Sequence, residues 1–106
     1  MIITTSESIH GKRIVATHGL VRGNTIRARH VGKDLLAFFK NLVGGEIAEY
    51  TKLMAESREQ SIDRMSDEAK RLGANAIIAT RFTTSMVSQA AAEILAVGTA
   101  VTVEDA

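Results

Sequence analysis

The sequence predicts an α+β domain with a mostly antiparallel sheet. Apolar residues alternate with period two over residues 13–29, and the same period returns over 75–87 and 92–103. Between these segments, residues 33–43 and 46–72 follow the helical period instead. The order is therefore two strands, two helices and two strands. The chain has 106 residues with no linker or internal repeat, which indicates a single domain over its whole length.

The N-terminal part of the chain is expected to be extended. Ile2–Thr5 is a short β-branched run, and Glu7–Lys12 reads as a turn that contains a glycine. Residues 13–29 then form one long bent strand or two short ones. Gly19 and Gly23 lie inside this segment, where glycine indicates a bulge, a bend or a close approach of two backbones.

Two helices are expected in the middle of the chain. Residues 33–43 carry an apolar stripe and end at Gly44-Gly45. Residues 46–72 read as one long helix that ends at Gly73, although an N-cap at Ser66 would divide it in two. The expected inward stripe of the long helix is Ile47, Tyr50, Met54, Arg58, Ile62, Met65, Ala69 and Leu72.

The length of the second helix bears on assembly. At 1.5 Å per residue it would measure about 40 Å, whereas a compact domain of this size is roughly 33 Å across. An unbroken helix would therefore extend beyond its own domain and pack on a neighbour. The last strand has a face of small residues, Ala92, Ala96, Gly98 and Ala100, which lets a helix or a second subunit approach closely.

Composition excludes several classes of protein. The chain has no Cys, which removes disulfides, thiolate metal sites and cysteine nucleophiles. It also has no Pro. No stretch approaches the roughly 18–20 apolar residues of a membrane span, and the first residues do not resemble a signal peptide. A cytoplasmic protein without a membrane partner is expected.

Charge is unevenly distributed although the formal net charge is only +1. Residues 1–40 hold seven basic and two acidic residues, and residues 41–106 hold six basic and ten acidic residues. A basic half could bind an anionic macromolecule. Alternatively, the two halves pair with each other. The shortage of aromatic residues for stacking bases favours the second interpretation, so nucleic acid is not an expected partner.

Several short segments together resemble the YbjQ family of small bacterial and archaeal proteins, which carries a heavy-metal-binding label. The matching segments are Gly11–Val15, Gly19–Gly23, Gly44-Gly45 with Tyr50, Arg58, Leu72–Ile78 and Gly98–Val101. They occur in the expected order over nearly the whole chain. Leu72–Ala76 and Gly98–Val101 are the most specific of them.

The resemblance implies a dodecin-like fold, with strands wrapped around a long helix, and a ring-shaped homo-oligomer that is a pentamer. It implies no particular reaction. Two departures weaken the metal label for this chain. Family members usually have a basic residue where this chain has Glu46, and acidic residues where it reads Thr80–Thr84.

Without Cys, a metal site would need His and carboxylate ligands for a divalent ion. His10, His18 and His30 are the candidates, but their spacing matches no local ligand motif. They could converge only through the fold or around a ring axis. His18 shares an apolar face with Ile14 and Leu20, which also fits a hydrogen-bonded core histidine.

Arg58 is the strongest candidate for binding a small ligand, because its predicted place on the inward stripe would bury a guanidinium group that needs an anion. An ion pair with Asp34 or with a carboxylate of a neighbouring subunit would satisfy it structurally. A pocket for a small anionic ligand, shared with Tyr50, is the functional alternative. Neither a nucleophile elbow nor a paired His and carboxylate is evident from spacing.

The sequence therefore predicts a non-enzymatic, cytoplasmic homo-oligomer that binds a small ligand or metal ion at a subunit interface or on the ring axis. The alternative is a structural or interaction module whose basic N-terminal half engages an anionic macromolecule.

Overall fold

The computed structural model describes residues 1–28, 48–88 and 91–106. In these ranges the elements are β1 (Ile2–Ile3), β2 (Lys12–Ala28), α2 (Ala48–Arg71), β3 (Ala76–Ser88) and β4 (Ala91–Asp105). The predicted α+β class is confirmed. The described residues do not include the predicted helix over 33–43, its Gly44-Gly45 end, or residues 89–90 between the last two predicted strands.

The four strands form one sheet in the order β1-β3-β4-β2. Both β2 and β3 pair with β4 in the antiparallel sense, whereas β1 pairs with β3 in the parallel sense through Ile2 and Ile3. The sheet is therefore mixed, which corrects the prediction of a mostly antiparallel sheet. A parallel pairing needs a long crossover between its strands, and here β2 and α2 lie between β1 and β3 in the chain.

The predicted segment 13–29 forms one long strand, β2, rather than two short ones. Its register with β4 shifts between Ile14 and Ala16 and again between Thr17 and Gly19. Gly19 has a φ of 111°, which favours glycine. These irregularities interrupt the strict alternation predicted for the first half of the strand, so residues on either side of them do not keep a common face.

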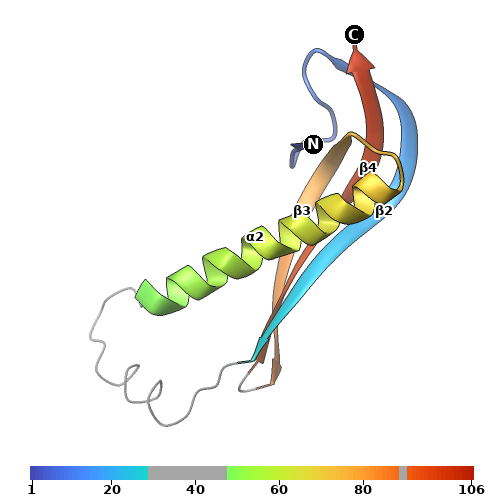
Figure 1. The fold of residues 1–106 in the computed structure, drawn as a ribbon. Helices are drawn as coiled ribbons and strands as arrows, with labels where there is room; N and C mark the ends of the chain where they lie inside the picture. The colour runs from blue at the N-terminus through green and yellow to red at the C-terminus, as the bar shows by residue number, and fades with distance from the viewer. Residues whose placement is uncertain (29–47, 89–90) are drawn as a thin grey trace.

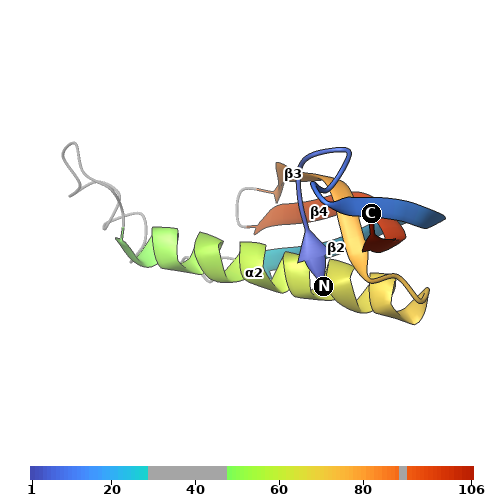
Figure 2. The same ribbon diagram turned by 90° about the horizontal axis from the view of Figure 1, so that it is seen from above.

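The molecule has two layers, with α2 packed on one face of the sheet (Figures 1 and 2). The helix runs without a break past Ser66, and its N-terminal end extends beyond the strands in both views. The molecule is elongated, with extents of 55 × 24 × 16 Å and a radius of gyration of 17.4 Å. A compact domain of this length would have about 13 Å. The overhanging helix predicted from the sequence is thus present.

The inner face of the sheet, against α2, is lined by small residues. Ala96 and Ala100 of β4 are fully buried and pack with Met65 and Ala69 of the helix. At Gly23 of β2 the backbones of the strand and the helix approach each other more closely still. A methyl group there would lie 2.2 Å from the carbonyl oxygen of Ser61 and 2.4 Å from the backbone nitrogen of Met65. Both glycine expectations for β2 are therefore confirmed, one as a bulge and one as a close approach.

Hydroxyl groups fill the interface next to Gly23. Ser57 and Ser61 are fully buried on α2, and Thr25 on β2 is 2% exposed. The Thr25 Oγ1 donates to the Ser57 carbonyl oxygen at 3.3 Å and lies 3.3 Å from the Ser61 Oγ. The Ser61 Oγ is also 3.1 Å from the carbonyl oxygen of Ile94 on β4. Hydrogen bonds thus tie the helix to both strands where side chains are too short for deep apolar packing.

Among the residues that the structure describes, those that pack on the outer face of the sheet cover one end of it. There Val101 and Val103 are buried together with Ala76, and Ile9 of the N-terminal segment packs against them. Farther along the sheet, Leu20 is 66% exposed and Ile26 is 59% exposed. One face of this sheet therefore keeps large apolar residues in contact with water.

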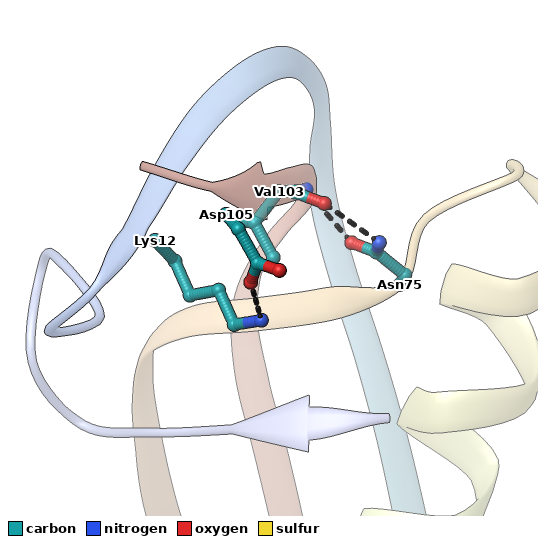
Figure 3. A network of polar contacts seen from close by, with 4 residues as sticks. All are labelled: Lys12, Asn75, Val103 and Asp105. Atoms are coloured by element: carbon teal, nitrogen blue, oxygen red, sulfur yellow. Dashed lines mark hydrogen bonds and ion pairs between the residues drawn. The ribbon is translucent and has the colours of Figure 1, made fainter.

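Two ion pairs join the N-terminal and C-terminal halves of the chain. Lys12 pairs with Asp105, as Figure 3 shows, and Arg13 pairs with Glu104. Each pair joins direct partners in the register of β2 and β4. The uneven charge distribution is thus partly explained by contacts within the chain.

Replacing Gly23 by Ala should destabilise the protein by about 1–3 kcal/mol or more, because the new methyl group meets helix backbone that cannot rotate away. The expected fall in Tm is roughly 10 °C, measured at matched protein concentration. A16V adds methyl groups at an exposed position of the same strand and serves as the control. An unchanged Tm for G23A would contradict the close approach.

The hydrogen bond and the charge of Lys12 hold the pKa of Asp105 below its ordinary value of 3.8. The stabilisation this pair supplies is therefore present above that ordinary value and is lost as the pH falls through the lowered one. NMR titration of the side-chain carboxyl carbon should show the lowered midpoint in the wild-type protein and a return towards 3.8 in K12M. K70M should leave the midpoint unchanged, and an Asp105 midpoint insensitive to K12M would contradict the pair.

Candidate functional site

The structure places Arg58 on the exposed side of α2, so the prediction of a buried guanidinium group is wrong. The buried stripe of the helix runs through Ser57, Ser61, Met65 and Ala69, one position away from the predicted one over its first half. The reason is the close approach at Gly23, which favours short side chains at the contact over longer apolar ones. The Arg58 side chain is open to solvent, so a ligand can reach it and it needs no buried anion.

The other two candidates for the ligand site are not placed by the structure. Tyr50 lies in the first turn of α2, but its side chain is not among those described. Asp34 lies outside the described residues. A pocket shared by Arg58, Tyr50 and Asp34 therefore remains a prediction.

The structure describes two of the three histidine candidates. His10 and His18 are both exposed, and His30 lies outside the described residues. The His18 Nε2 is 2.7 Å from the Thr102 Oγ1 of β4. The expected hydrogen bond is present, but the expectation of a core position is wrong, because the bulge beside Gly19 disrupts the apolar face on which it was based.

The described residues of one chain do not fit a metal centre. No group of three or more His, Asp or Glu side chains within residues 1–28, 48–88 and 91–106 is placed to hold an ion. His18 contacts a threonine rather than a carboxylate. A shallow hollow on the outer side of α2 includes two carboxylates, Glu56 and Glu59, together with Lys52, Ala55 and Gln60. Its acidic residues are accompanied by a lysine, which opposes the binding of a cation.

The segment Leu72–Ala76, the most specific part of the resemblance, has a structural role. Gly73 has a φ of 86°, and the amides of Gly73 and Ala74 donate to the carbonyl oxygens of Lys70 and Ala69. This is the Schellman arrangement that ends a helix. Figure 3 shows the next step, in which the side-chain amide of Asn75 makes two hydrogen bonds with the backbone of Val103, at 2.9 and 2.8 Å. The motif thus fastens the end of α2 to β4.

The second specific segment, Gly98–Val101, also has a structural role. A methyl group at Gly98 would lie 2.5 Å from the Cγ2 of Ile77 and 3.2 Å from the Oγ1 of Thr80. Gly98 therefore gives room to two β3 side chains on the inner face of the sheet. The two most specific segments of the resemblance thus position the helix and the strands.

Sequence reasoning missed one arrangement of charged side chains. Arg22 on β2 and Arg81 on β3 are both direct register partners of Val97 on β4. They therefore flank Val97 on one face of the sheet and are exposed. Nothing in the sequence pairs two arginines 59 positions apart. Only strand register brings them into one row.

Comparison with known proteins gives the same family over almost the whole chain. Residues 1–104 match a family model described as "Putative heavy-metal-binding", YbjQ_1. A UPF0145 protein of Dehalococcoides mccartyi is 56% identical over 98% of this chain and 100% of its own length. A UPF0145 protein of Clostridioides difficile is 54% identical over 99% of this chain and 94% of its own length.

The fold also has a counterpart among solved structures. A protein of unknown function from Pediococcus pentosaceus, assigned to the DUF74 family, superposes with a TM-score of 0.67 over 98% of both chains. Its sequence identity of 16% supports the fold alone. Within the described residues, no helix is long and apolar enough to cross a bilayer. The match over residues 1–104 and the close relatives together show that the chain belongs to the YbjQ family.

Proposed function

We propose that this chain is a non-enzymatic, homo-oligomeric binding protein that forms a ring-shaped pentamer. The ligand is a small anion or a divalent metal ion, held between subunits or on the ring axis. The observation that carries the proposal is the uncovered outer face of the sheet, where Leu20 and Ile26 are more than half exposed. Large apolar side chains exposed on one face of a sheet support a surface that another molecule covers.

The shape of the molecule supports assembly. An elongated subunit with an overhanging helix has more surface for its volume than a compact one. A closed ring of identical subunits would bury such surface on both sides of every copy. The dodecin-like arrangement implied by the family resemblance belongs to this proposal.

The positions of the candidate residues support a site that needs more than one copy. His10, His18 and Arg58 are each exposed, and each supplies one suitable group. A rotational axis would repeat such a group once per subunit, so that equivalent donors from several copies come together. The chain contains no Cys, which suits the reducing conditions of the cytoplasm, where we place the protein.

Native mass spectrometry tests the assembly and the ligand together. The expected mass is about 57 kDa, five times the 11.4 kDa of one chain, plus any retained ion or metabolite. A single species at the mass of one chain, across micromolar concentrations, would overturn the proposal. A ring of another size would keep the proposed assembly and correct only the number of subunits.

The role of Arg58 can be tested with inorganic phosphate as the probe. Millimolar phosphate should raise the Tm of the wild-type protein by a few degrees through preferential binding to the folded state. R58M should lose this rise and keep the native mass, because the side chain is exposed and makes no core contact. R71M, an exposed arginine change on the same helix, is the control. Equal rises in R58M and wild type would show that Arg58 does not bind the anion.

A further inference from the structure

We propose that Arg22 and Arg81 form a paired guanidinium surface that binds the acidic side of α2 from a second copy of this chain. The inference rests on the assembly proposed above and names the surfaces that make it. It comes from one row of side chains across the sheet and one stripe along the helix.

The row crosses three strands on the outer face of the sheet. Because Arg22 and Arg81 both pair in register with Val97, the two arginines stand on opposite sides of it, roughly 10 Å apart across two strand spacings. Gly23, the neighbour of Arg22, faces α2, so alternation directs Arg22 away from the helix. The next row along the strands places Leu95 between Asn24 and Thr83, so apolar surface adjoins the arginine pair.

The charges of this row are incompletely matched within the described chain. Arg81 uses its Nη1 to donate to the carbonyl oxygens of Thr5 and Thr80, both at 2.8 Å. These two bonds hold the side chain in place and leave its other N–H donors available. The two ion pairs found among residues 1–28, 48–88 and 91–106 involve neither Arg22 nor Arg81. The face therefore presents two positive charges beside Val97 and Leu95. The carboxylate of Glu93, farther along the same face, accepts a hydrogen bond from Asn24.

The stripe lies on the side of α2 that points away from its own sheet. Glu56, Glu59, Asp63 and Asp67 are all exposed and follow one another at three- and four-residue intervals. That spacing places them on one side of the helix, opposite the buried Ser57 and Ser61. Because a carboxylate recurs on nearly every turn, a helix laid across the outer face can bring one to each guanidinium group.

The positions of these charges favour a head-to-tail arrangement of neighbouring copies. Two copies packed outer face to outer face would place arginine pairs against each other, which like-charge repulsion disfavours. Packing the acidic side of α2 on the outer face of the next copy joins opposite charges instead. It uses two different surfaces of every subunit, which is the kind of interface that closes into a ring.

Charge reversal tests the pairing. In native mass spectra, R22E/R81E and E59R/D63R should each convert the assembly to single chains, with circular dichroism confirming that the subunits stay folded. The chain that carries all four substitutions should assemble again, because both surfaces have exchanged sign. K70E/R71E, at two exposed residues in the last turn of α2, alters the net charge as much as R22E/R81E does and should keep the native mass.

The outcomes separate this inference from the proposed function. A wild-type protein that is a single chain would overturn the assembly itself, and the inference with it. A wild-type ring that persists in R22E/R81E would overturn only the inference. So would a four-substitution chain that folds but remains single, because the arginines and the acidic stripe would then contact something other than each other.

Discussion

The contact between α2 and β2 at Gly23 is the constraint on which the rest of this structure depends. No side chain separates the two backbones there, and the atoms next to it belong to the helix main chain. Such an approach leaves room only for short groups, and Ser57, Ser61 and Thr25 supply hydrogen bonds where longer residues would supply apolar packing. This contact fixes which side of the helix is buried. It therefore also fixes that Arg58 and the acidic stripe of α2 face water.

The two faces of the sheet differ in how much of their apolar surface is buried. α2 lies mainly over β2 and β4, and the N-terminal segment covers one end of the outer face. Leu20 and Ile26 on β2 remain uncovered, as does Met86 on β3. An isolated sheet with one polar face would alternate cleanly between apolar and polar residues. This sheet does not, and its exposed apolar residues are the basis of the assembly proposed above.

The family model is described as heavy-metal-binding, but the described residues of this chain form no preformed metal centre. The segments that identify the family have structural tasks instead. Gly73 ends the helix, Asn75 binds it to β4, and Gly98 admits the side chains of Ile77 and Thr80. In the function proposed above, exposed groups such as Arg58 and His18 would supply the ligand chemistry.

The amino-acid sequence by itself determined the α+β class, the long unbroken helix, the roles of Gly19 and Gly23, and the small-residue face of β4. Each follows from a local period or from the conformational freedom of glycine. The tertiary structure alone decided the parallel pairing of β1, the one-position rotation of the buried stripe on α2, and the exposure of Arg58 and His18. It also decided the meeting of Arg22 and Arg81 beside Val97. These depend on strand register and on the closest distance two backbones can reach, and neither is encoded within a window of neighbouring residues.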